Sequence, residues 1–215
     1  MNNRRLPIYL VLDNSGSMTG DPIQAVNQGI QALVGDLQTD PFAIETTYLS
    51  LIEFNSSAKQ IVPLTEISNF QPPTLTTRGT TSMGAALKLL TQSIKKEVKK
   101  PGLEEKGDWK PLVFLMTDGQ PTDSWEQSAD LLKQQKIANI IACAAGDGAN
   151  ELVLKRITEN VIKLKDVSPD TFKAFFQWVS ASIVQSSASI GSSPPEGQGI
   201  NLPAPPASAG FQIIP

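Results

Sequence analysis

Oxygen-bearing side chains with regular spacing follow an apolar run near the start of the chain. In LPIYLVLDNSGSM, Asp13, Ser15 and Ser17 occupy every second position. A second apolar run, PLVFLMT, leads into Asp118, and the stretch TTRGTTSM places Thr80 among further hydroxyl groups. Carboxylate and hydroxyl oxygens are hard ligands that suit magnesium, calcium or manganese. If the fold brings these side chains together, they predict a cation site built from oxygen alone.

Each of these motifs also has a plainer explanation. Asp, Asn, Ser and Gly favour turns, so both aspartates would suit the exit from a strand. Thr80, Thr81 or Ser82 would equally suit the N-cap of a following helix. The prediction of a site therefore depends on the elements that position the three segments.

Apolar runs alternate with segments of helical periodicity along the chain. Continuous apolar runs predict buried strands, and apolar residues spaced by three or four predict amphipathic helices. Strands are predicted at residues 7–12, 43–54, 59–66, 111–117, 139–144 and 161–165, and helices at residues 22–37, 82–98, 124–135, 150–157 and 169–190. Pro63 indicates that the third strand is an edge strand, joined to the second by an Asn-Ser-Ser turn.

This order of elements predicts an α/β fold of the Rossmann-like, doubly wound type. Its sheet is expected to be mostly parallel with one antiparallel edge strand, and helices cover both faces. Ligands of such sheets bind at the carboxyl ends of the strands. Asp13 and Asp118 each end a predicted parallel strand, so both are expected at that edge, beside helix N-termini that add backbone N–H groups.

The composition excludes several classes of function. The chain has 215 residues, a net charge of −3 and no histidine, which excludes Ser-His-Asp and Cys-His catalysis and the common histidine-bound zinc sites. No basic stripe indicates a nucleic-acid partner, and no apolar run reaches the roughly 18 residues that span a membrane. The single cysteine, Cys143, is interpreted as a buried thiol. With no signal peptide recognised, a cytoplasmic protein is expected.

The domain organisation follows from a change of composition late in the chain. One domain is predicted over residues 1–190, and a tail rich in Gly, Ser, Pro and Ala over residues 191–215. The tail is expected to be flexible, because this composition buries little apolar surface. It ends in FQIIP, for which a chance apolar end and a short docking segment both remain open.

Together the three polar motifs resemble those of von Willebrand factor A domains. DNSGS at Asp13–Ser17 matches the DxSxS motif of that family, Gly79-Thr80 fits the loop that carries its threonine ligand, and TDG around Asp118 fits its last aspartate. The resemblance covers about residues 5–185. It implies a metal-ion-dependent adhesion site (MIDAS) formed by these three segments.

The resemblance also implies roles for the five residues. Ser15, Ser17 and Thr80 would bind the cation through their hydroxyls, with Thr81 as the alternative to Thr80. Asp13 and Asp118 would act mostly through waters or as hydrogen-bond acceptors. The expected cation is Mg²⁺, with Mn²⁺ or Ca²⁺ as alternatives, because compact oxygen ligands with waters suit the smaller ion.

The implied function is binding without catalysis. A partner protein would supply a Glu or Asp carboxylate to the metal, and neither nucleic acid nor membrane is expected as a partner. The short form and the sequence NSGSM resemble the bacterial tellurium-resistance TerY subgroup. That likeness implies a place in a stress-response system beside a kinase or phosphatase encoded nearby.

The rival hypothesis is a Mg²⁺-dependent phosphatase of the haloacid-dehalogenase type, with Asp13 as nucleophile. That chemistry needs a second aspartate two residues later as acid and base. Here the position is Ser15, which does not replace a carboxylate. A P-loop is excluded, because the sequence lacks GxxxxGK[ST].

Overall fold

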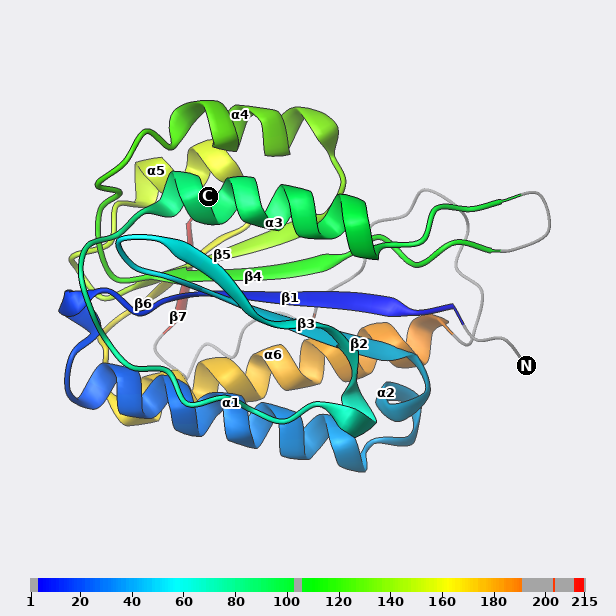
Figure 1. Cartoon of the computed structure of the whole chain (residues 1–215). Helices are drawn as coiled ribbons and strands as arrows, with labels where there is room; N and C mark the ends of the chain where they lie inside the picture. Colours follow the sequence, from blue (N-terminus) through cyan, green and yellow to red (C-terminus); the bar gives the residue numbers. More distant parts are fainter. Residues whose placement is uncertain (1–3, 103–105, 191–202, 204–210, 215) are drawn as a thin grey trace.

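A computed structural model of the chain describes residues 4–102, 106–190, 203 and 211–214 (Figure 1). Its centre is a seven-stranded sheet in the order β3-β2-β1-β4-β5-β6-β7. The strands are β1 (Leu6–Asp13), β2 (Thr47–Phe54), β3 (Ala58–Glu66), β4 (Leu112–Thr117), β5 (Asn139–Ala145), β6 (Val161–Leu164) and β7 (Phe211–Ile214). Strands β2, β1, β4, β5 and β6 run parallel, and β3 and β7 pair antiparallel at the two edges.

Helices cover both faces of the sheet, as Figure 1 shows. One face carries α1, α2 and α6, and the other carries α3, α4 and α5. The helices are α1 (Asp21–Thr39), α2 (Pro41–Thr46), α3 (Met83–Glu97), α4 (Glu126–Gln135), α5 (Glu151–Ile157) and α6 (Pro169–Ile190). A continuous apolar strand is required where both faces are covered. In β1, Ile8 and Leu10 pack into one core, and Tyr9 and Val11 pack into the other.

The predicted α/β fold class is confirmed, with one addition at the end of the sheet. The predicted antiparallel edge strand is β3, and β7 is a second one, paired with β6 from Phe211 opposite Leu164 to Ile214 opposite Val161. The described part of the FQIIP segment, Phe211–Ile214, therefore docks on the chain's own sheet. The rest of the predicted tail, apart from Pro203, lies outside the described residues. The Phe211 ring lies 6.2 Å from that of Phe175, which extends the α6 core over this edge.

The second predicted strand begins later than its sequence indicates. Residues 43–46 are helical, because Asp40 and Pro41 start α2. The carboxylate of Asp40 accepts a hydrogen bond from Ala43 N at 2.8 Å, as an N-cap does, and Pro41 occupies the first helical position. A local cap therefore outweighs the strand propensity of the residues that follow it.

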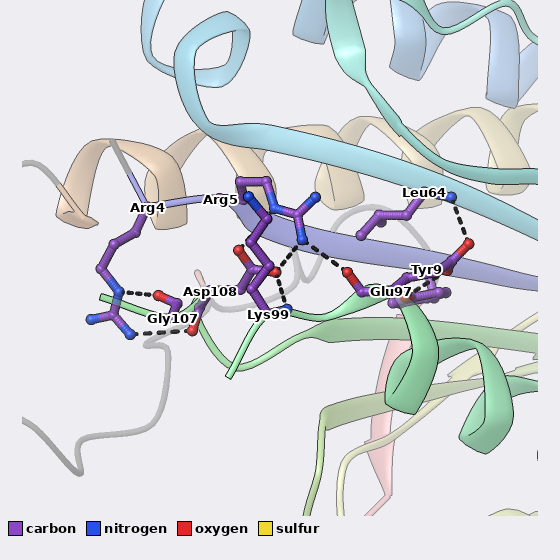
Figure 2. Close-up of polar contacts among 8 residues, drawn as sticks. All are labelled: Arg4, Arg5, Tyr9, Leu64, Glu97, Lys99, Gly107 and Asp108. Atoms are coloured by element: carbon purple, nitrogen blue, oxygen red, sulfur yellow. Dashed lines mark hydrogen bonds and ion pairs between the residues drawn. The ribbon is translucent and has the colours of Figure 1, made fainter. Parts of the chain in front are cut away.

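At the other end of β1 from Asp13, a polar network joins the start of this strand to its neighbours (Figure 2). Arg5 donates from Nε to Asp108 Oδ1 at 2.8 Å and from Nη2 to the Glu97 carbonyl at 2.8 Å. The Glu97 carboxylate accepts from Tyr9 Oη at 2.9 Å and from Leu64 N at 3.2 Å. Burial, with the nearby Glu97 carboxylate, raises the pKa of Tyr9, so its hydroxyl remains a donor. The network joins the start of β1 to α3, to β3 and to the loop after α3.

None of the helices in the described ranges is both long enough and apolar enough to cross a membrane.

We expect Asp108→Asn to lower the free energy of unfolding by about 1.5–3 kcal/mol. The substitution removes the charged carboxylate whose two oxygens accept hydrogen bonds from Nε and Nη2 of the half-buried Arg5. The side chains of Arg5 and Asp108 are 20% and 3% exposed. Urea denaturation midpoints of the variant and the wild type measure the loss.

The matched control is Asp130→Asn. The two carboxylate oxygens of Asp130 also accept hydrogen bonds from one arginine, Arg156, but both side chains are 46% exposed. The loss in this variant is expected to be clearly smaller, since solvent screens the exposed pair. Equal losses in the two variants would contradict the role assigned to burial.

Candidate metal centre

The fold brings the two predicted aspartates to one edge of the sheet. Asp13 is the last residue of β1, and Asp118 follows the last residue of the neighbouring parallel strand β4. Thr117 joins the two strand ends, because its hydroxyl donates to Asp13 Oδ2 at 2.6 Å. The other carboxylate oxygen of Asp13 accepts from Ser15 N at 2.8 Å. Asp13 is 1% exposed and is held on both oxygens.

A chain of hydroxyl contacts connects the first motif to the second aspartate. The Oγ atoms of Ser15 and Ser17 lie 3.0 Å apart, and Ser17 donates to Asp118 Oδ1 at 2.7 Å. The turn that places them is a short 3₁₀ helix, Gly16–Met18, in which Met18 N donates to Ser15 O at 3.1 Å. The alternating Asp-x-Ser-x-Ser spacing therefore delivers three side-chain oxygens to one place.

The two carboxylates are close enough to interact electrostatically. Burial raises the pKa of Asp13, and the negative charge of Asp118 adds to the effect. Hydrogen bonds from Ser15 and Thr117 oppose this rise. Burial also raises the pKa of Asp118, and the hydrogen bond from Ser17 opposes it. A positive ion at this point would relieve an electrostatic cost that the protein residues relieve only in part.

Asn14 fixes the first loop to its neighbours. It is fully buried, and its Nδ2 donates to Glu53 Oε2 at 3.1 Å and to the Thr76 carbonyl at 2.9 Å. Its Oδ1 accepts from Asn55 Nδ2 at 3.0 Å. Glu53 also accepts from Arg78, at 3.0 Å. This role of Asn14 depends on residues distant along the chain, so it was not predictable from the sequence.

Gly79 lets the threonine loop approach the serine loop. Its φ is +65°, which favours glycine, and a Cβ at this position would lie 2.1 Å from Ser56 Oγ. Its carbonyl accepts from Gly16 N at 3.0 Å. The hydroxyl of Thr80 lies 3.2 Å from Ser56 Oγ, and Thr80 N donates to the same oxygen at 3.0 Å. Thr80 is exposed, and its hydroxyl contacts the β2–β3 turn.

Thr81 faces a different loop from that of its neighbour. It is 6% exposed, and its Oγ1 lies 3.4 Å from the point where a Cβ on Gly119 would stand. Ser17 Oγ lies 3.8 Å from the same point. The backbone of Thr81 is fixed by Thr122, with N to Oγ1 at 3.1 Å and O to N at 2.9 Å. Its side chain is therefore held beside the TDG turn.

Two further residues shape the rim of the site. Asp123 accepts from Gly84 N and Ala85 N, both at 2.9 Å, so it caps the start of α3 from another loop. Gly148 packs against the Asp118 carbonyl, because a Cβ there would lie 2.5 Å from that oxygen. Sequence reasoning gave no role to Gly148, whose contact joins turns that are distant along the chain.

The donor set fits a hard divalent cation. Carboxylate oxygens of Asp13 and Asp118 and hydroxyls of Ser15, Ser17 and Thr81 gather at the carboxyl end of β1 and β4. Within the described ranges no three His, Cys, Asp or Glu side chains cluster as a conventional metal site. The one cysteine, Cys143, is buried in β5, and burial raises its pKa. The arrangement therefore suits an ion that accepts neutral oxygen ligands.

Comparison with known proteins identifies the family to which this fold belongs. The profile of the von Willebrand factor type A domain matches residues 8–174. An uncharacterized protein from Synechocystis is 32% identical over 126 residues, which is 55% of this chain and 27% of that protein.

Solved structures share the same architecture at low sequence identity. Proximal thread matrix protein 1 from the mussel byssus, with a zinc-occupied MIDAS motif, has a TM-score of 0.60 and 20% identity, over 83% of this chain and 48% of that one. A von Willebrand factor type A protein from Catenulispora acidiphila has a TM-score of 0.65 and 16% identity, over 85% of this chain and 43% of that one. The chain thus spans between about a quarter and half of the length of these relatives.

We expect Asp118→Asn to raise the melting temperature of the metal-free protein at pH 7. The raised pKa means that the folded state binds the Asp118 proton more readily than the unfolded state, so ionisation at pH 7 costs stability. The gain should shrink as the pH falls through that raised pKa. Each kcal/mol corresponds to about 2–4 °C in a domain of this size.

Thermal melts in EDTA between pH 4 and pH 8 measure this effect. The control is Asp36→Asn on the exposed side of α1, which removes the same charge away from the site. An Asp118→Asn protein that melts at or below the wild-type temperature at pH 7 would show that the carboxylate is not under electrostatic strain.

Proposed function

Since the chain belongs to the von Willebrand factor type A domain family, we propose that it is a metal-dependent protein-binding module. The observation that carries the proposal is the convergence of the Asp13, Ser15, Ser17 and Asp118 oxygens at one edge of the sheet. The proposed site is a MIDAS whose cation accepts the carboxylate of a Glu or Asp from a partner protein. The proposal is supported by the family, whose members are metal-dependent protein-interaction modules.

Mg²⁺ is the proposed cation, with Mn²⁺ or Ca²⁺ as alternatives. A bound cation would supply a Lewis-acidic position that attracts an anionic oxygen. Ser15 and Ser17 are proposed as direct hydroxyl ligands, while Asp13 and Asp118 orient them and balance charge. The mussel protein holds zinc in its MIDAS motif. Here the absence of histidine from the sequence and the oxygen-only donor set favour a harder ion.

We propose Thr81, rather than Thr80, as the threonine of this site. Thr81 Oγ1 faces the Gly119 turn together with Ser17 Oγ, whereas Thr80 Oγ1 pairs with Ser56. Thr80 was the residue expected from the sequence, and a movement of this loop on metal binding would be needed to bring its hydroxyl to the aspartates.

The contacts of Asp13 favour binding over phosphatase chemistry. A nucleophilic carboxylate needs an oxygen free to attack, yet both oxygens of Asp13 accept hydrogen bonds and the side chain is 1% exposed. The position of the acid and base of that mechanism is occupied by Ser15, whose N donates to Asp13. We therefore propose that the protein is not an enzyme.

The biological setting is a further part of the proposal. A cytoplasmic, bacterial stress-response role of the tellurium-resistance kind, with a kinase or phosphatase as partner, is retained from the sequence resemblance. The buried, single thiol of Cys143 is compatible with a reducing compartment. The relatives described above do not bear on this role.

We expect Mg²⁺ to raise the melting temperature of the wild type relative to EDTA. A ligand at 100 times its dissociation constant stabilises by about 2.7 kcal/mol. Ser15→Ala/Ser17→Ala should abolish the shift, because it removes both proposed hydroxyl ligands. Ser57→Ala, at an exposed serine of the β2–β3 turn, should keep it. A shift of equal size in all three proteins would place the cation elsewhere.

We expect Thr81→Val to weaken Mg²⁺ binding by about tenfold or more, and Thr80→Val to leave it nearly unchanged. Valine keeps the shape of threonine and removes only the hydroxyl, so the two variants form a matched pair. Isothermal titration with MgCl₂ measures both affinities. The opposite ranking would restore Thr80 as the ligand.

The partner interaction is tested by a pull-down from the native cells with the immobilised wild type, in Mg²⁺ and in EDTA. A partner released by EDTA, and not captured by Asp118→Asn, is the expected result. A partner that is retained under both conditions would bind through another surface.

A further inference from the structure

Residues of α3 and α4 line a groove. Both helices lie on the face of the sheet opposite α1 and α6 (Figure 1). The volume of the groove is about 470 Å³. The wall on α3 carries Lys88, Gln92 and Lys95, and the wall on α4 carries Gln127, Leu131 and Gln135. The spacings of four and three on α3, and of four on α4, place each trio on one side of its helix. The groove therefore runs along one side of each helix.

The charge of the groove is positive, although the chain as a whole has a net charge of −3. Lys88 and Lys95 are exposed, and no aspartate or glutamate belongs to the lining. Within the part of the chain that the structure describes, neither lysine takes part in an ion pair. By contrast, Lys133 on α4 is paired with Glu159, at 2.6 Å. The groove lysines are thus charges without an internal partner.

The opposite wall offers an apolar contact and an amide group. Leu131 is 54% exposed, one of three large apolar side chains that are more than half exposed among the described residues. Gln127, one turn before it, is also exposed and lines the groove. A bound peptide would supply an apolar side chain to Leu131 and a backbone group to the amide of Gln127.

We infer that this groove binds an acidic segment of a partner protein. Carboxylates of the segment pair with Lys88 and Lys95, an apolar side chain covers Leu131, and backbone groups bond to the glutamine side chains. Charge complementarity carries the choice of occupant, because a cationic, amide-rich groove on an acidic protein selects an anionic ligand.

The described residues of the tail lie away from this groove. Trp178 Nε1 on α6 donates to the Pro203 carbonyl at 3.0 Å, and β7 pairs with β6 at the end of the sheet. Helix α6 covers the face of the sheet opposite α3 and α4 (Figure 1). The proposed occupant is therefore a separate protein.

One end of the groove adjoins the candidate metal centre. Gly84 and Ser124 line that end. Gly84 is capped by Asp123, and Thr122 bonds to Thr81. A segment that leaves the metal centre would enter the groove directly. The binding of one partner to both the metal centre and the groove rests on the proposed function. The binding of an acidic segment to the groove alone does not.

The experiment selects phage-displayed random dodecapeptides on the full chain in EDTA, where the metal centre contributes nothing. Selected peptides are then titrated, as fluorescein conjugates, into wild type, Lys88→Glu/Lys95→Glu and Lys96→Glu/Lys100→Glu. The last variant changes the net charge by the same amount on exposed lysines outside the groove. Lys95 and Lys96 both lie in the last turn of α3, so both variants lose one favourable interaction with the helix dipole.

The expected result is enrichment of peptides with two or more acidic residues and an apolar residue. Their affinity should fall by about tenfold or more in Lys88→Glu/Lys95→Glu, and change little in the control. No enrichment, peptides without acidic residues, or equal loss in both variants would overturn the inference, as would binding of a labelled oligonucleotide in place of peptide. These outcomes do not depend on whether the candidate metal centre binds a cation, because the titrations contain EDTA.

Discussion

The buried carboxylate of Asp13 is the constraint on which the rest of the site depends. A carboxylate at the end of a central strand, 1% exposed, has to be satisfied by hydrogen bonds or by a cation. Thr117 from β4 and the backbone N of Ser15 supply two hydrogen bonds. The first of these fixes β4 against β1 at the sheet edge, and the second folds the serine loop back over the strand end. The second carboxylate, Asp118, lies close enough to the first that its negative charge adds to the rise in the pKa of Asp13.

The surrounding loops turn this constraint into a rigid arrangement. Asn14 bonds to side chains at the end of β2 and to the loop that follows β3, so three segments share one buried amide. Gly79 adopts a left-handed conformation, which brings its carbonyl within 3.0 Å of Gly16 N. These contacts fix the backbone around the hydroxyls before any ligand arrives. A preorganised oxygen cluster of this kind binds a cation without a large loss of conformational entropy.

The opposite edge and the helical faces have different roles. Arg5, Asp108 and Glu97 close the amino ends of the strands with hydrogen bonds among half-buried groups, which stabilises the sheet and leaves the other edge for binding (Figure 2). The α3–α4 groove runs along both helices from that second edge, and its lysines form no ion pair with the residues that the structure describes. The stabilising network and the proposed metal centre are therefore separated along the strand direction, whereas the groove extends along α3 between them. This separation follows from the parallel sheet, because all the carboxyl ends of parallel strands lie on one side.

The sequence by itself determined the fold class, the parallel strands and the ends at which the aspartates stand, because apolar periodicity and strand burial are local properties. The bounds of α6 were predicted as residues 169–190 and are confirmed. The sequence did not determine β7, since four residues after a Gly- and Pro-rich run carry no signal for the edge they pair with. It did not separate Thr80 from Thr81, because adjacent threonines of one loop differ only in which way the backbone turns them. Tertiary structure decided that difference: the left-handed Gly79 and the bonds to Ser56 and Thr122 direct one hydroxyl outward and the other toward Gly119.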